Sequence, residues 1–289
     1  MPSRIKALSR FPRAGLLLLL LTGSAWAQDR NFQIYLCLGQ SNMEGYPGIP
    51  AADQTWSDPR FQVLAAVDFP AQGREKGHWY TAIPPLCRPN SGLSPADYFG
   101  RTMVASLPAN VRIGVVNVAV AGAKIEVFNP ASLNAYAATA PAWMKGIIAA
   151  YGGNPYEHLV AMGKLAQKAG VIRGILLHQG ESNINDPEWP AKVKTLYENL
   201  LKDLDLKAAD VPLLAGELLG ADQQGACANM NEIIAGLPKL IPTAHVVSSR
   251  GCPGRPDHLH FEPAGYRELG RRYAATMLPL LGFKPADVK

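Results

Sequence analysis

Five apolar stretches along the chain have the length and composition of strands buried on both faces of a sheet. They cover residues 34–38, 111–120, 172–178, 211–217 and 244–248, and the second is an almost unbroken run of β-branched side chains. Capping residues and apolar periodicity predict helices over 93–107, 156–169, 189–204, 230–240 and 262–280. Strands that alternate with helices of this length favour an α/β fold, with a parallel sheet of about five strands covered on both faces.

One long region breaks this alternation. Residues 46–95 are rich in Pro, Gly and Trp and follow neither the helical nor the strand period. Irregular stretches of that length are usually functional or disordered, but the embedded aromatic residues Trp56, Phe61 and Trp79 indicate an ordered segment. Contact with a substrate and a structural wrap over the surface are equally compatible with this composition.

The first 27 residues have the pattern of a secretory signal peptide. A positive segment with Arg4 and Arg13 precedes the apolar run Leu16–Leu21, and Ala25-Trp26-Ala27 forms a small-x-small cleavage site. We therefore expect a secreted or periplasmic protein whose mature chain, residues 28–289, is a single domain. An uncleaved N-terminal anchor is the alternative, although the apolar run is shorter than the roughly 18 residues that span a bilayer.

Most of the apparent basic character belongs to that leader. The whole chain has 28 basic and 23 acidic residues and a formal net charge of +5. The leader contains four basic and no acidic side chains, so the mature chain carries about +1. A nearly neutral chain gives no reason to expect a nucleic-acid partner or, once the leader is removed, a basic membrane-binding patch.

Four cysteines remain in the mature chain. An even number allows disulfides in an exported protein, with three connectivities. Cys227 and Cys252 lie in loop-like surroundings, so we favour a bridge between them. Cys37 falls inside the first predicted strand, where a buried thiol is expected, and a contact with Cys87 is the weaker alternative. The spacings do not resemble a zinc site, and we expect neither a metal nor a cofactor.

Three predicted strands end in turns that carry polar residues or glycine. Gly39-Gln40-Ser41-Asn42 follows the first strand, Ala121-Gly122-Ala123-Lys124 the second, and Gln179-Gly180-Glu181 the third. In open α/β sheets the ligand crevice lies beyond the carboxyl ends of the strands, so these turns are expected to meet at one edge. By its position alone Ser41 could simply cap a helix.

Residues near the end of the chain complete a set suited to ester hydrolysis. Such a reaction needs a nucleophile, a base and a group that orients the base. Asp257 and His260 are three positions apart, just before the last predicted helix, where both side chains can face one site. We assign Ser41 as nucleophile, His260 as base and Asp257 as the group that orients it, with His258 as a competing base.

Donors for the developing oxyanion are the remaining requirement. The backbone N–H groups of Ser41 and Gly122 and the side-chain amide of Gln179 are the candidates, because glycine allows a close approach of the backbone to a reacting group. Asn42 and Glu181 are expected to support these residues from beside the site.

The motifs around these residues carry a resemblance to a known family. Gly39-Gln40-Ser41-Asn42-Met43-x-Gly45, Ala119-Val120-Ala121-Gly122-x-x-Ile125, His178-Gln179-Gly180-Glu181-Ser182 and Asp257-x-x-His260-Phe261 together resemble the SGNH hydrolase superfamily. The likeness is greatest to sialate O-acetylesterases and acetylxylan esterases of carbohydrate esterase family 6. It implies a flavodoxin-like, three-layer α/β/α fold, a metal-free acetylesterase mechanism and the triad and oxyanion residues assigned above. The second motif departs from the family, which usually has Gly-Gly and small hydroxyl residues there. We expect Lys124, which stands there instead, to face the sugar and to favour an acidic one.

We therefore expect a serine esterase that removes O-acetyl groups from acetylxylan or another acetylated poly- or oligosaccharide through an acetyl-enzyme. The alternatives are a sialate O-acetylesterase, an inactive carbohydrate-binding relative, and a lipase or thioesterase of the same superfamily. No long apolar segment suggests a tunnel for an acyl chain, and no phosphate-binding glycine loop follows a predicted strand.

Overall fold

A mostly parallel sheet of seven strands organises the protein, whose computed structural model describes residues 1, 28–46 and 48–286. The order is β3-β2-β4-β1-β5-β6-β7, and only the β2–β3 pair is antiparallel among these strands. The strands are β1 (Asp29–Gly39), β2 (Phe61–Leu64), β3 (Trp79–Thr81), β4 (Arg112–Ala119), β5 (Gly170–His178), β6 (Leu213–Gly216) and β7 (Ala244–Val247). The α/β prediction is confirmed, with seven strands rather than about five. The predicted signal peptide lies outside the described residues.

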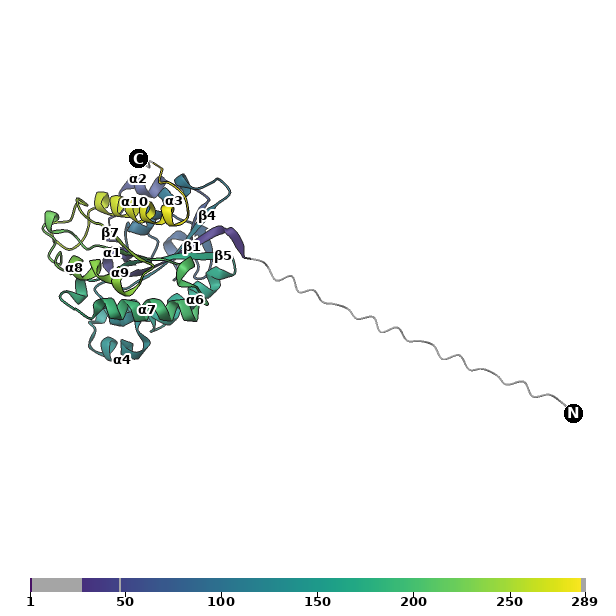
Figure 1. Cartoon of the computed structure of the whole chain (residues 1–289), viewed down its shortest axis with the longest axis horizontal. Coiled ribbons are helices and arrows are strands. Elements are labelled where there is room, and N and C mark those ends of the chain that lie inside the picture. Colours follow the sequence, from purple (N-terminus) through teal and green to yellow (C-terminus); the bar gives the residue numbers. More distant parts are fainter. Residues whose placement is uncertain (2–27, 47, 287–289) are drawn as a thin grey trace.

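Helices cover both faces of this sheet (Figure 1). On one face α3 (Pro95–Ser106) packs against α10 (Pro263–Leu280), and the other face is covered by α6 (Pro155–Gln167) and α7 (Trp189–Asp203). The other described α-helices are α1 (Ser41–Glu44), α2 (Ala51–Thr55), α4 (Pro130–Thr139), α5 (Ala142–Ala150), α8 (Met230–Ala235) and α9 (Leu237–Leu240). The three-layer α/β/α arrangement is therefore confirmed.

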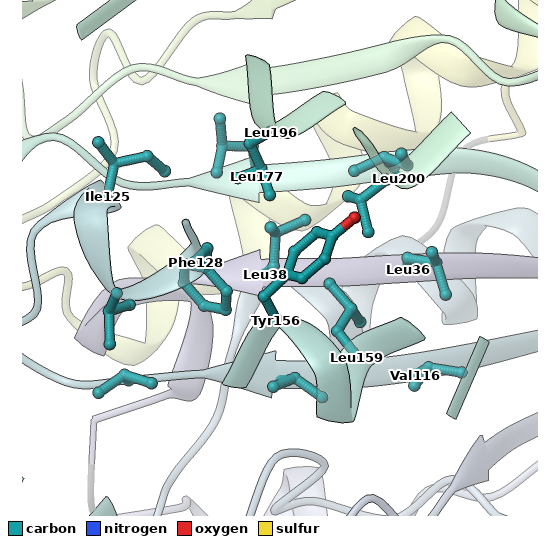
Figure 2. Close-up of a cluster of buried hydrophobic side chains, with 14 of the residues drawn as sticks. Leu36, Leu38, Val116, Ile125, Phe128, Tyr156, Leu159, Leu177, Leu196 and Leu200 are labelled. Carbon is teal, nitrogen blue, oxygen red and sulfur yellow. The ribbon is translucent and has the colours of Figure 1, made fainter. Parts of the chain in front are cut away.

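The central strand β1 contributes side chains to two separate cores, one on each face of the sheet. It pairs with β4 on one side and β5 on the other, and successive side chains of a strand point to opposite faces. Leu36 and Leu38 pack with residues of α6 and α7 in the core shown in Figure 2, whereas Tyr35 and Cys37 pack beneath α3 and α10. A strand buried on both faces must be apolar at nearly every position, which explains the run seen in the sequence.

Residues 46–95 contain more regular structure than their composition predicts. They form α2, β2 and the antiparallel edge strand β3. The side chain of Arg74 is only 6% exposed, and its guanidinium donates hydrogen bonds to the carbonyls of Ile83 at 2.6 Å and Pro85 at 3.1 Å. The backbone N–H of Gly92 donates a hydrogen bond to the carbonyl of Gly45 at 2.9 Å. The two ends of this region therefore lie side by side, next to the end of α1.

The connection from β4 to α6 also folds further than expected. It contains the 3₁₀ turn η2 (Ile125–Phe128) and the helices α4 and α5. Only Leu133 is buried in the alanine-rich α4, so no apolar stripe marks it as a helix in the sequence. The helix predicted over 230–240 is divided into α8 and α9 at Gly236.

The cysteines correct one prediction. All four are free thiols and buried. Cys227 packs in the core beneath α6 and α7, whereas Cys252 packs in the core beneath α3 and α10. The two residues that we expected to form a disulfide therefore pack in different cores and are free. Cys37 and Cys87 share the second core and are free as well.

Candidate active site

Ser41 lies where β1 ends and the single turn of α1 begins. The sharp change of direction depends on Gly39, whose φ is +148° and whose Cα approaches the backbone of His178 so closely that a Cβ would lie 2.0 Å from its carbonyl oxygen. Only glycine fits such a position. The turn leaves the Ser41 side chain half-buried and facing a cavity of about 280 Å³ at the carboxyl ends of the strands.

Three predicted catalytic side chains form one hydrogen-bonded chain. Ser41 Oγ is 3.0 Å from His260 Nε2, and His260 Nδ1 is 2.8 Å from Asp257 Oδ2. The other carboxylate oxygen of Asp257 accepts the backbone N–H groups of Leu259 and His260, each at 2.9 Å. The ring of Tyr46 packs against the imidazole, with 4.7 Å between centroids. The distances are those that proton transfer from a serine to a histidine requires.

The charge of Asp257 is stabilised in this arrangement. Burial raises the pKa of its carboxyl group, but the hydrogen bonds from the His260 backbone, the His260 ring and the Leu259 backbone lower it by more, so the pKa lies below its usual value. His258, the competing base, has an exposed side chain and a left-handed backbone with φ of +58°, whereas His260 contacts Ser41. Of the two histidines, it is therefore His260 that is placed to accept a proton from Ser41.

Gly122 lines the same cavity from the turn after β4. Its φ is +66°, and its carbonyl accepts a hydrogen bond from Ser182 Oγ at 2.8 Å. The preceding N–H, that of Ala121, donates to Glu44 Oε2 at 3.0 Å, and Arg88 forms an ion pair with the same carboxylate. These bonds fix the turn relative to α1, which begins at Ser41.

The Gln179 side chain differs from its prediction. It is 1% exposed, and its amide nitrogen lies 2.8 Å from Asn183 Oδ1, 3.1 Å from Gln40 Oε1 and 3.3 Å from the carbonyl of Ala123. Its carbonyl oxygen accepts the indole N–H of Trp189. Because both amide protons already have acceptors inside the protein, Gln179 belongs to a buried network below the cavity rather than to the oxyanion hole.

Asn42 and Glu181 lie beside Ser41 and the loop of His260. The amide nitrogen of Asn42 donates to Glu181 Oε1 at 2.6 Å and to the carbonyl of Leu259 at 3.1 Å. Its oxygen accepts from the backbone of Phe261 at 3.4 Å and from the hydroxyl of Tyr266 at 2.8 Å. One side chain therefore holds the residues on both sides of His260.

Three residues of this region were not assigned a role from the sequence: Glu44, Tyr46 and Trp143. Glu44 is 4% exposed, and an acidic side chain directly after the buried Met43 and three positions after Ser41 is the signal that could have identified it. No local pattern marks Tyr46 or Trp143, because both reach the site through tertiary packing. The side chain of Lys124 is exposed, and its backbone N–H donates to the hydroxyl of Tyr136.

Two further properties concern the described residues only. Within them, no group of three or more His, Cys, Asp or Glu side chains is arranged to hold a metal ion. Every helix in 28–46 and 48–286 is also too short or too polar to span a bilayer.

Solved structures of several proteins share this fold. A protein from Arabidopsis thaliana is 22% identical, with a TM-score of 0.65 over 86% of this chain and 98% of that one. The protein NanS is 17% identical, with a TM-score of 0.61 over 87% of this chain and 98% of that one. A carbohydrate acetylesterase from Xanthomonas citri is 18% identical, with a TM-score of 0.55 over 83% of this chain and 55% of that one.

The sequence itself identifies the family. Residues 31–279 match the family described as "carbohydrate esterase, sialic acid-specific acetylesterase". This range includes all the motifs on which the resemblance to SGNH hydrolases rests, and that resemblance is confirmed. The chain therefore belongs to this family of carbohydrate esterases, and it is a carbohydrate O-acetylesterase.

Proposed function

We propose that this carbohydrate O-acetylesterase works through a Ser41–His260–Asp257 triad. The observation that carries the proposal is the continuous chain of hydrogen bonds from Ser41 Oγ through the imidazole to the Asp257 carboxylate, with distances of 3.0 and 2.8 Å. A serine hydroxyl is a weak nucleophile until a base accepts its proton, and the base works best when a carboxylate fixes its orientation.

The reaction then follows from the positions of these atoms. Ser41 Oγ attacks the carbonyl carbon of the acetyl ester while its proton passes to His260 Nε2. The imidazolium returns that proton to the departing sugar hydroxyl, which leaves Ser41 acetylated. Water, deprotonated by His260, attacks the acetyl-enzyme and releases acetate. Asp257 remains ionised throughout and stabilises the positive imidazolium.

The oxyanion in both steps requires donors at the cavity. We assign this role to the backbone N–H groups of Ser41 and Gly122, because both residues line the cavity and backbone donors held in place need no rearrangement during the reaction. The hydrogen bonds from Ser182 to the Gly122 carbonyl and from Ala121 to Glu44 support this assignment, since they hold the second turn in position.

For the substrate we propose O-acetyl groups on the sugars of a poly- or oligosaccharide such as acetylxylan. O-acetylated sialic acid is the second candidate, and the description of the family favours it. Both esters have a small acyl group and a bulky polar leaving group, which suits an open cavity of about 280 Å³. Assays with acetylated xylan, acetylated pectin and O-acetyl sialic acid distinguish the candidates.

The triad is tested by acetate release from these substrates by the purified mature chain. Ser41→Ala and His260→Ala are each expected to lower kcat by about 10³-fold or more, while the protein stays folded. His258→Asn is the matched control, because it changes an exposed histidine in the same loop and Asn tolerates the left-handed backbone there. Unchanged turnover in Ser41→Ala would reject the triad. Glycan binding without acetate release by the wild type would identify an inactive binding relative.

A further inference from the structure

One large aromatic side chain beside the catalytic residues has no part in the triad. Trp143, the second residue of α5, is 56% exposed. It lines the same cavity as Ser41 and His260. Among the described residues the other large exposed hydrophobic side chains are Met1, Ile184, Leu240 and Leu280. Exposing so much indole has a cost in apolar hydration, and an aromatic residue left open at a ligand cavity commonly contributes to binding.

The indole is seated against the turn proposed to hold the oxyanion. A Cβ added to Gly122 would lie 2.6 Å from the indole ring, so the absence of a side chain at this glycine allows the ring to approach the backbone. The contact places Trp143 next to the proposed oxyanion donor. A substrate group that lies on the Gly122 side of the reacting carbonyl therefore meets the indole.

Several bonds hold this position. The hydroxyl of Tyr136, on α4, accepts the backbone N–H of Lys124 at 2.9 Å and contacts the Sδ atom of Met144 at 3.4 Å. The Lys145 ammonium group donates to the carbonyl of Ala138 at 3.0 Å, which ties α5 to α4. Met144, the neighbour of Trp143, is 4% exposed and anchors the first turn of α5 in the core. The backbone that carries Trp143 is thus fixed before any substrate binds, which limits the entropy lost on binding.

We propose that Trp143 binds the sugar ring that carries the acetyl group, with the face of the pyranose stacked on the indole. This inference rests on the proposed function. A pyranose presents C–H groups on its faces and hydroxyl groups at its edge, so an aromatic plane buries the apolar face and leaves the hydroxyls in water. An acetyl methyl group is too small to need such a surface, and the exposure of the indole suits the larger leaving group.

The proposal has a consequence for specificity. Stacking requires a ring face that presents C–H groups, so an axial hydroxyl on that face weakens it. The enzyme should therefore discriminate strongly between acetylated pyranosides and simple alkyl acetates, and only weakly among pyranosides whose stacked face carries no axial hydroxyl.

The test compares two acetate esters that differ only in the leaving group: acetylated methyl β-xylopyranoside and ethyl acetate, both followed by acetate release. Trp143→Ala is expected to lower kcat/KM for the pyranoside by about tenfold or more and to leave the value for ethyl acetate within about twofold. Trp143→Phe should recover most of the loss. Leu240→Ala, which removes another exposed hydrophobic side chain, should change neither value.

Two results would overturn the proposal. An equal loss on both esters would mean that Trp143 only supports the Gly122 turn. A gain on ethyl butyrate with an unchanged value for the pyranoside would mean that it limits the acyl group instead. If the wild type cleaves no ester, the proposed function is rejected, but the stacking role of Trp143 is not. Calorimetric titration of xylo-oligosaccharide into Ser41→Ala, with and without Trp143→Ala, then decides the stacking role independently, because weaker binding without the indole supports the role and equal binding rejects it.

Discussion

The side chain of Asn42 holds the loop that carries His260, the proposed catalytic base. Its two ends hold the carbonyl of Leu259 and the N–H of Phe261, the neighbours of His260 in the chain. Because Asn42 directly follows Ser41, this one residue fixes the position of the His260 loop relative to Ser41. The remaining bonds of Asn42, to Glu181 and Tyr266, fix the amide itself.

Replacing this residue is expected to separate catalysis from binding. In Asn42→Ala the loop of His260 loses both tethers, and a small displacement of a catalytic group costs about 10² in rate. We expect kcat to fall by about that factor with little change in KM, and the free energy of unfolding to fall by roughly 1–3 kcal/mol because buried partners lose their hydrogen bonds. Steady-state kinetics and urea denaturation measure the two effects.

Tyr266→Phe provides the control, because it removes only the hydroxyl that orients the Asn42 oxygen. Its effect on kcat should be much smaller. A wild-type kcat in Asn42→Ala would show that the His260 loop holds its position without these tethers.

For single residues, the sequence predicts candidate reactive side chains better than it predicts the hydrogen bonds that hold neighbouring side chains in place. Ser41, Asp257 and His260, which the structure joins by hydrogen bonds, could be proposed from their side-chain chemistry, although the sequence left His258 as a competitor to His260. The amide of Gln179, predicted as an oxyanion donor, is instead bonded inside the protein, and its partners Gln40 and Ala123 lie 139 and 56 positions away in the chain. Hydrogen-bond partners that meet only through tertiary packing leave no pattern along the chain.

The capping residues at the start of helix α3 are visible in the sequence and affect the stability of the folded protein. Ser94 and Asp97 form a capping box, and Pro95 occupies the first turn. Asp97 is fully buried, and its Oδ1 atom has no hydrogen-bond partner among the described residues. Burial raises its pKa from 3.8 to about 6, although hydrogen bonds from Ser94 and the charge of Arg101 oppose the rise.

A raised carboxyl pKa means that the folded protein binds this proton more tightly than the unfolded chain. Stability from this group therefore falls as pH rises from about 3.8 to about 6. The gap between the two values corresponds to roughly 3 kcal/mol. Asp97→Asn removes the titration, so the variant should gain stability relative to the wild type between pH 4 and 7, as measured by denaturant unfolding at several pH values.

Asp58→Asn is a control of opposite sign. Burial raises the pKa of Asp58, but hydrogen bonds from Arg60 lower it by more, so its stabilisation is present at neutral pH and is lost in acid. Parallel pH profiles for Asp97→Asn and the wild type would contradict the shift assigned to Asp97.

Whole elements were predicted where they carry their own pattern. The central strands β1, β4 and β5 are buried on both faces and α10 has an apolar stripe, so each is visible in the sequence. β2 and β3 contain only four and three residues. β6 and β7 have only four residues each, but they stand in the regular alternation of strands and helices that residues 46–95 lack. β2 pairs with the distant strand β4 and β3 pairs with β2, and no local window contains the β2–β4 contact.

Across the whole molecule, the sheet acts as a barrier between two cores. Cys227 packs in one core and Cys252 in the other, and burial raises the pKa of each of the four thiols, to about 11 for Cys252 and about 12 for Cys87. Buried thiols with raised pKa values hold little reactive thiolate.

We therefore expect four titratable thiols after unfolding without a reductant, and almost no reaction of the native protein with a thiol reagent. A reducing agent should leave Tm unchanged, since no disulfide contributes to stability. Fewer than four thiols, or a lower Tm on reduction, would contradict the free cysteines. A surface Ser57→Cys variant, which adds an exposed thiol, should react at once and thus confirms that the reagent works.

The Ser41–His260 contact joins residues that are 219 positions apart. During synthesis the nucleophile emerges early, but its base is made only when little more than the last helix is left to translate. Under the proposed mechanism, a chain that has not been translated through His260 therefore carries a serine without its base. Under this mechanism, acetate release requires that folding has brought the two ends of the polypeptide together. The activity can therefore serve as an assay for complete folding of the chain.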